Sequence, residues 1–333
     1  MINPMSTQVS NLPANLNSEQ LSLDLSAPIY EMVHASKRPN TMKAYRADWQ
    51  AFTTWCRAND LNTMPATAEA VAAYLTDRRY DLSVTTLARH VASISQAHKW
   101  WTPPQPNPTD TELVRAVMQG LRATANQRTR ESRKGKAPAL TAEQMRQLLA
   151  PIGDDLAGLR DKALLLIGYK AALRRSELAS VTWQQIEWLP EGIVLHLHGA
   201  KTDHDYLGQA VALRYEQNDY CPITALKHWR IACAQQVEVD TGAVFRSVNK
   251  HLQLGATLTA HSIGAIVSAR AAEVGLQGVT AHSLRRGHIT EGHKQGRTEA
   301  DLMRTSRHKS VAVFRGYIDD ANLMSRATGA GLL

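Results

Sequence analysis

The stretch RHKSVAVFRGY, residues 307–317, decides how the second half of this chain is interpreted, because its final tyrosine follows a histidine by nine positions. Three earlier stretches offer side chains that bind phosphate: ALRRSEL at 172–178, HGAKTD at 198–203 and HSLRRGH at 282–288. A tyrosine hydroxyl titrates near pH ~10, so a nucleophilic tyrosine needs cations and proton carriers around it. Together the four stretches predict a site for phosphoryl transfer.

Each residue type in these stretches suits one part of that chemistry. An arginine guanidinium can hold two phosphate oxygens at once and can compensate the charge that builds on them during attack. Histidine exchanges protons near neutral pH, and a lysine in a polar hairpin turn could protonate a leaving oxygen. The candidate catalytic residues are Arg174, Lys201, His282, Arg285, His308 and Tyr317.

Taken singly, these residues have plainer interpretations. Arg174 could form a helix-end ion pair with Glu177, Arg285 could lie on the surface, and Lys201 could simply be solvated. Other tyrosines compete with Tyr317 for the role of nucleophile, and they are Tyr206, Tyr215 and Tyr220. His288 and His293 could suggest a metal, but no HExxH or paired-cysteine pattern accompanies them, so no metal site is expected.

The composition is that of an ordinary soluble protein. The chain has 333 residues, 44% hydrophobic and 20% charged, and about two domains are expected. A net charge of +8 favours a polyanionic partner, although many mildly basic proteins bind no nucleic acid. Cys56, Cys221 and Cys233 have no paired spacing, and the first basic residue is Lys37, so free thiols and a cytoplasmic location are expected.

The chain divides into four predicted parts. Residues 1–20 form a mobile arm, 21–123 an all-α domain, 124–139 a basic linker, and 140–333 a mainly α mixed α/β domain with a small antiparallel sheet. Helices are predicted from Asn40 and over Ala68–Tyr80, Val84–Trp101 and Thr111–Arg122. A capping box joins Thr141 to Gln144, and a strand, turn and strand span Gly192–Arg214. From about residue 223 onward the pattern predicts mainly helices.

The predicted linker is strongly basic. Five cations, against Glu131 alone, give it a local charge of +4, and they are Arg128, Arg130, Arg133, Lys134 and Lys136. Such a segment could lie along a phosphate backbone or could be a solvated interdomain loop. Both interpretations stay open.

The joint order of these motifs resembles the tyrosine site-specific recombinases of the phage integrase family. ALRRSEL is similar to the family's first arginine motif, with Glu177 as acidic support, and HSLRRGH is similar to its His-x-x-Arg box. The resemblance implies cleavage and rejoining of double-stranded DNA through a 3′-phosphotyrosyl intermediate and a Holliday junction. It further implies a homotetramer on two inverted-repeat sites, with no ATP, metal or other cofactor.

The resemblance extends to the Cre-type members of the family in the segments at 40–56, 83–101 and 317–333. It implies two domains closing on duplex DNA as a clamp, and a C-terminal segment, 327–333, that docks on a neighbouring protomer or folds back on its own domain. The residues expected to contact DNA are Lys43, Ala44, Arg46, Arg89, His261, Arg133, Lys134 and Lys136.

Some positions depart from the family pattern. Ser306 and Arg307 stand where Leu-Gly is common, and Ser283 and Arg286 replace the usual Asp and His. Three other functions remain possible at this point: a site-independent type IB topoisomerase, a telomere resolvase and a protein that binds DNA without cutting it.

Overall fold

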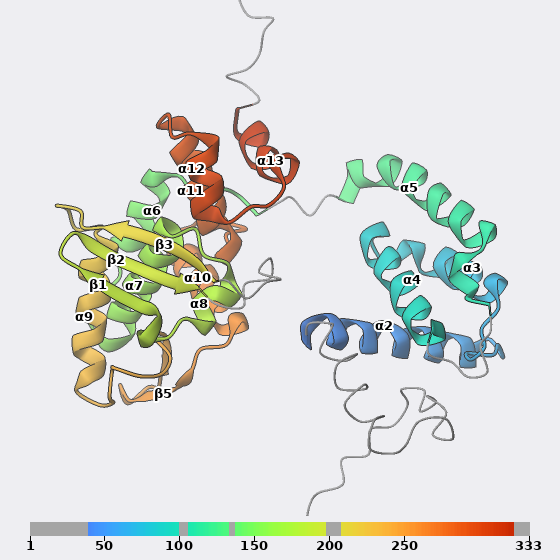
Figure 1. Cartoon of the computed structure of the whole chain (residues 1–333), viewed down its shortest axis with the longest axis horizontal. Helices are drawn as coiled ribbons and strands as arrows, with labels where there is room; N and C mark the ends of the chain where they lie inside the picture. The colour runs from blue at the N-terminus through green and yellow to red at the C-terminus, as the bar shows by residue number, and fades with distance from the viewer. Residues whose placement is uncertain (1–38, 100–105, 133–136, 198–207, 323–333) are drawn as a thin grey trace, which may run out of the picture. The chain divides into compact units, whose positions relative to one another are not determined.

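The structure is a computed structural model that describes residues 39–99, 106–132, 137–197 and 208–322 (Figure 1). The chain forms two compact units, Met1–Lys134 and Gly135–Leu333. The arm predicted at 1–20 and the segment 327–333 lie outside the described residues. No helix in the described part is long and apolar enough to cross a membrane.

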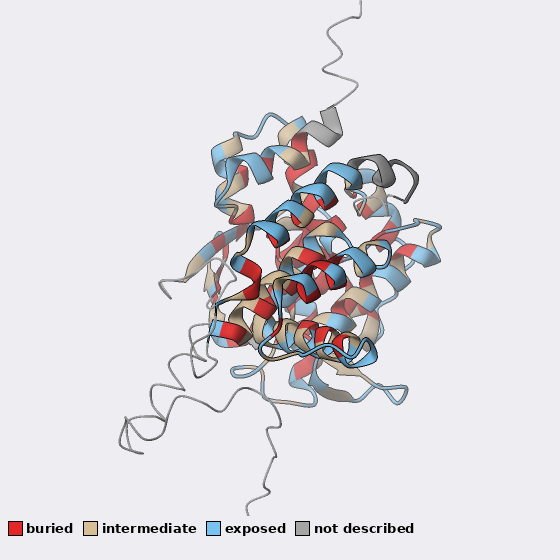
Figure 2. Ribbon diagram, turned by 90° about the vertical axis from the view of Figure 1, so that its right-hand side faces the viewer, coloured by how far each residue is buried: buried red, intermediate tan, exposed pale blue. Residues whose placement is uncertain are grey.

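The N-terminal unit is helical in its described residues. Its elements are α2 (Pro39–Ala58), α3 (Ala68–Asp77), η1 (Arg78–Tyr80), α4 (Val84–Lys99), η2 (Pro108–Asp110) and α5 (Glu112–Ser132). The helices are amphipathic, and Figure 2 shows buried residues on one side of each and exposed residues on the other. Phe52 and Tyr74 meet edge to face at 5.2 Å in the core, and Leu87 and Ile94 are fully buried there.

A buried polar network connects three of these helices. Asp48 accepts two hydrogen bonds from Arg89, at 2.7 and 2.9 Å, and its Oδ1 lies 3.0 Å from His90 Nε2. The other ring nitrogen of His90 bonds the Tyr74 hydroxyl at 2.8 Å. A buried carboxylate is costly unless it is paired in this way, so the network fixes how α2, α3 and α4 pack.

The helix predicted over Thr111–Arg122 is longer than predicted and runs into the segment assigned to the linker. We predicted a linker from residue 124, but α5 continues to Ser132. The segment lost its apolar periodicity while keeping good helix formers, and a helix can extend into solvent without an apolar stripe. The loss of the apolar pattern therefore does not mark the end of the helix.

The C-terminal unit is mainly helical, with two small antiparallel sheets. Its helices are α6 (Ala142–Leu149), α7 (Leu156–Lys170), α8 (Arg175–Ser180), η3 (Trp183–Gln185), α9 (Pro222–Ala234), α10 (Ala260–Glu273), α11 (Ala281–Lys294), α12 (Glu299–Ser306) and α13 (Val311–Asn322). The strands are β1 (Ile186–Leu189), β2 (Gly192–Leu197), β3 (Gln209–Arg214), β4 (Arg246–Val248) and β5 (Leu254–Thr257). The predicted mixed α/β character of this part is confirmed.

The larger sheet has the order β1-β2-β3, and β2 pairs with β3 as predicted. Ile193 lies opposite Leu213 and Leu195 opposite Val211, so one face of the sheet is apolar and buried. The helix α7 is buried almost throughout and packs against α9 and α11, so it forms the centre of this unit. Figure 1 shows α11, α12 and α13 together at one end of the unit.

One element of this unit was not predicted. β4 and β5 form a hairpin within a region where mainly helices were expected. The predicted capping box at the start of α6 is confirmed, since Thr141 Oγ1 accepts from Gln144 N at 3.1 Å and Gln144 Oε1 accepts from Thr141 N at 3.0 Å.

Candidate active site

The candidate catalytic side chains come from four separate places in the C-terminal unit. Arg174 caps the start of α8, His282 and Arg285 lie on the first turns of α11, His308 follows α12, and Tyr317 lies on α13. The fold brings these five residues together through a chain of contacts. Lys201 lies outside the described residues.

Arg174 is held by Glu177, one turn further on. Arg174 Nη1 donates to Glu177 Oε1 at 2.6 Å, and the Arg174 backbone N–H donates to Oε2 at 2.7 Å. Burial would raise the pKa of the Glu177 carboxyl, but Arg307 and Arg174 outweigh it and lower that pKa. Glu177 is therefore an anion that fixes Arg174, which remains 23% exposed at its side chain.

Arg285 is buried beside His308. Its Nη1 donates to the Ala172 carbonyl oxygen at 2.8 Å, and its Nη2 lies 3.3 Å from both ring nitrogens of His308. Burial, with Arg174 and Arg307 nearby, lowers the pKa of Arg285 to about 9. A phosphate would supply the negative charge that this buried guanidinium lacks.

The contacts of His308 indicate which of its ring nitrogens carries the proton. Ser306 Oγ donates to the Leu302 carbonyl oxygen at 2.6 Å, so at the 2.8 Å contact with His308 Nδ1 the hydroxyl oxygen accepts. The proton then lies on Nδ1, and Nε2 offers its lone pair to Arg285. Burial, followed by the field of Arg285, lowers the pKa of His308 to about 3, so the ring is neutral here.

Tyr317 lies between the two histidines. Its hydroxyl is 3.3 Å from His282 Nε2, and its ring centroid is 5.1 Å from that of His308. The Arg286 guanidinium lies 5.4 Å from the Tyr317 ring centroid, within the range of a cation–π contact. Loss of solvent around His282, together with Arg285 and Arg286, lowers its pKa, so its neutral ring can accept a proton from the tyrosine.

The two rival tyrosines that the structure describes do not share this environment. Tyr215 is exposed, with Lys227 Nζ 4.8 Å from its ring centroid, and Tyr220 packs beside the hydrophobic core. Tyr206 lies outside the described residues. Within the described ranges, no group of three or more His, Cys, Asp or Glu side chains could hold a metal ion.

The residues expected to contact DNA fall into two groups. Lys43, Arg46 and Arg89 are exposed, Ala44 is partly buried, and His261 is exposed on the first turn of α10. The predicted linker contacts Arg133, Lys134 and Lys136 lie outside the described residues. Two hydrogen bonds to Asp48 hold the Arg89 side chain in place. The sequence did not suggest this pair, because 41 positions separate the two residues.

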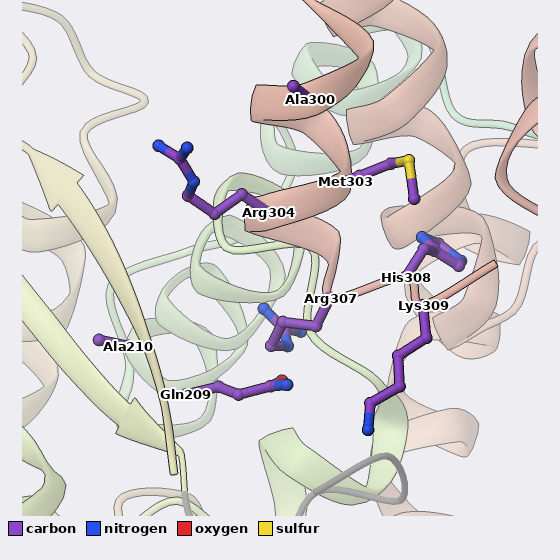
Figure 3. A pocket seen from close by; sticks show the side chains of 8 residues that line it. All are labelled: Gln209, Ala210, Ala300, Met303, Arg304, Arg307, His308 and Lys309. Carbon is purple, nitrogen blue, oxygen red and sulfur yellow. The ribbon is translucent and has the colours of Figure 1, made fainter. Parts of the chain in front are cut away.

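Arg307 is a member of this site that we did not predict. The sequence showed it only as a departure from the family pattern, yet its side chain is buried and bonds Glu177 Oε2 at 2.7 Å. It also lines a pocket with His308, Lys309 and Arg304 (Figure 3). No local signal could have revealed this contact, because 130 positions separate the two partners.

The arrangement concentrates positive charge around one hydroxyl. Arg174 and Arg307 pair with the Glu177 carboxylate, whose charge also acts on Arg285, and neutral His282 lies within reach of the Tyr317 hydroxyl. Such a site can bind an anion, remove the proton from the tyrosine and stabilise a phosphorane-like transition state.

Comparison with known proteins agrees with this chemistry. The phage integrase family model matches residues 138–323. An integrase/recombinase xerD homolog from Selenomonas ruminantium is 32% identical over 317 residues, which cover 92% of this chain and 88% of the relative.

Solved structures of this family share the fold. The Tn1549 transposon integrase in complex with transposon right end DNA has a TM-score of 0.60 at 14% identity, covering 89% of this chain and 96% of that one. The XerH site-specific recombinase bound to a palindromic difH substrate, in a post-cleavage complex, has a TM-score of 0.57 at 16% identity, covering 77% and 70%. The chain therefore belongs to the phage integrase family and is a tyrosine recombinase, an enzyme of site-specific DNA strand exchange.

Proposed function

We propose that Tyr317 is the nucleophile of this recombinase and that the residues around it form its catalytic set. The Tyr317 oxygen attacks the scissile phosphorus, the bond from phosphorus to the 5′ oxygen breaks, and a 3′-phosphotyrosyl link remains. His282 takes the tyrosine proton and Lys201 gives a proton to the leaving 5′ oxygen. The observation that carries the proposal is the 3.3 Å contact between the Tyr317 hydroxyl and His282 Nε2.

Arg174, Arg285 and His308 bind the nonbridging oxygens of that phosphate. His308 donates there once it has taken up a proton, which a bound phosphate favours because its charge raises the pKa of the ring. The energy of the broken bond is kept in the phosphotyrosyl link, so a 5′ hydroxyl from a second duplex can reverse the step without ATP. Two such exchanges pass through a Holliday junction.

The remainder of the proposal concerns the DNA and the assembly. The N-terminal helical unit acts as a core-binding domain, with Lys43, Ala44, Arg46 and Arg89 toward the duplex and His261 contacting it from the C-terminal unit. Four protomers bind two inverted-repeat sites, with the segment 327–333 docking on a neighbour. The linker cations Arg133, Lys134 and Lys136 follow the phosphate backbone.

Tyr317→Phe tests the nucleophile. On nicked suicide duplexes taken from inverted repeats next to the gene, we expect the natural protein to form an SDS-resistant adduct and the variant to form none. Binding of the same DNA should stay within about twofold, since one hydroxyl adds little to a large polar interface. The matched control is Tyr215→Phe, which should form the adduct at the natural rate.

These duplexes, together with supercoiled plasmids, separate the competing functions. An adduct from Tyr317→Phe would assign the chemistry to another residue. Relaxation of supercoiled plasmids without any target site would identify a topoisomerase, hairpin ends a telomere resolvase, and DNA binding without an adduct a non-catalytic protein.

A further inference from the structure

Arg307 occupies a backbone position that normally disfavours its side chain. It caps the end of α12 in the left-handed conformation, with φ 57° and ψ 45°. Glycine or asparagine is the usual choice there, because other residues lose roughly 1–2 kcal/mol in this conformation. The chain accepts that cost and also buries a charged side chain, which is only 1% exposed.

Both terminal nitrogens of the Arg307 guanidinium are hydrogen-bonded, to the loop between α7 and α8, to α8 and to the end of α12. Nη1 donates to the carbonyl oxygens of Ala171 at 3.1 Å and Thr305 at 2.5 Å. Nη2 donates to the Ala172 carbonyl oxygen at 3.0 Å and to Glu177 Oε2 at 2.7 Å. A planar fork is needed to reach these acceptors together.

These acceptors also hold the two candidate catalytic arginines. The Ala172 carbonyl oxygen accepts from Arg285 Nη1, and Glu177 binds Arg174 through its other oxygen. The Arg307 carbonyl oxygen accepts from Arg174 Nη2 at 3.1 Å. Arg307 thus touches the supports of both residues, while Figure 3 shows its side chain pointing away from that of the adjacent His308.

We infer that Arg307 is a positioning residue for strand cleavage, which fixes Arg174 and Arg285 through Glu177 and the Ala172 carbonyl. The inference rests on the roles proposed above for those two arginines. Arg307 does not contact the scissile phosphate. Arg307 stands where a helix usually ends in glycine. Its ion pair with Glu177 connects the end of α12, which His308 follows, to α8.

A purely structural ion pair would behave differently. Its loss would lower stability and would reduce DNA binding and cleavage together, as the folded fraction fell. A positioning residue instead affects the rate of the bound complex, because misplaced catalytic groups slow the chemical step after binding. Cleavage rate and DNA affinity must therefore be measured separately.

The variants are Arg307→Gly, Arg307→Lys and the control Arg146→Ala, an arginine on α6 that does not line this pocket and whose side chain pairs with Glu143 and is 52% exposed. Arg307→Gly relieves the backbone strain and keeps the carbonyl that Arg174 uses. We expect its single-turnover adduct formation on a nicked suicide duplex to fall roughly 30-fold or more, with affinity within about threefold. Arg307→Lys should recover about threefold of that loss and stay well below the natural rate, and Arg146→Ala should match the natural rate within about twofold.

The inference is overturned if Arg307→Gly cleaves within about twofold of the natural protein, or if rate and affinity decline in parallel. Should Arg307→Gly melt below the assay temperature, Arg307→Lys decides in its place, and a natural rate in that variant also overturns the inference. The proposed function is tested separately, because it fails if the natural protein forms no adduct through Tyr317.

Discussion

At the scale of single residues, Ser306 is predicted to control the reactivity of His308. Its hydroxyl oxygen accepts the Nδ1 proton, which leaves Nε2 as the acceptor for Arg285 Nη2, a nitrogen that lies 3.3 Å from both ring nitrogens. In Ser306→Ala the imidazole can turn or change tautomer, so we expect cleavage of a suicide substrate to slow roughly tenfold to a hundredfold while binding is kept. Ser262→Ala on α10 is the control, since its hydroxyl lies against Thr259. Natural cleavage rates in Ser306→Ala would show that the serine only fills space.

The same scale shows which contacts a sequence can reveal. Arg174 with Glu177, and His282 with Arg285, are three positions apart, and helical geometry brings such pairs to one side. The place of Arg307 depends on an αL turn and on carbonyls more than 130 positions away. Every residue has a backbone carbonyl, so the sequence does not show which carbonyl oxygens accept from Arg307, and these contacts could not be predicted.

At the scale of elements, α11 is placed by a glycine. A Cβ on Gly287 would collide with the Leu140 carbonyl oxygen and would lie 2.7 Å from the Tyr169 ring. We expect Gly287→Ala to lower the free energy of unfolding by about 1–3 kcal/mol and to slow cleavage, because α11 carries His282 and Arg285. Urea unfolding and the adduct assay measure the two effects.

Gly316→Ala is the control for that experiment. It lies in α13, and nothing comes within 4 Å of its added Cβ. An alanine there should leave stability unchanged or raise it by roughly 0.5–1 kcal/mol. If both glycine variants unfolded alike, close packing would not be what distinguishes Gly287.

Most elements were predictable because their burial is periodic. Apolar patterns predicted the helices that begin near Asn40, Ala68, Val84 and Thr111, and also the β2–β3 pair. The structure confirms these elements. The β4–β5 hairpin was missed because β4 has three residues and no buried ones, which is too short to show alternation. The extension of α5 was missed because the helix runs on where its apolar stripe has stopped.

At the scale of the whole molecule, the five described candidate catalytic residues come together only in the folded C-terminal unit, and folding keeps the buried histidines neutral. Burial lowers the pKa of His308 to about 3 and that of His288 to about 4. In the N-terminal unit burial also lowers the pKa values of His90 and His98. At a mildly acidic pH these histidines are therefore neutral in the folded protein and protonated in the unfolded chain.

Because these histidines bind protons only when the chain unfolds, we expect the protein to lose stability at a pH above the range in which its carboxylates are protonated. An unfolded histidine titrates near pH ~6.5, so the stability contributed by neutral His308 and His288 is complete above that pH. It is lost as the pH falls toward their folded pKa values. We expect the free energy of unfolding of the DNA-free protein to fall by about 2 kcal/mol or more between pH ~7 and pH ~5, measured by urea unfolding at fixed ionic strength. In His288→Gln the loss should be smaller, and an identical pH dependence in that variant would exclude His288 as a source, because stability depends on pH only through groups whose proton binding differs between the folded and unfolded chain.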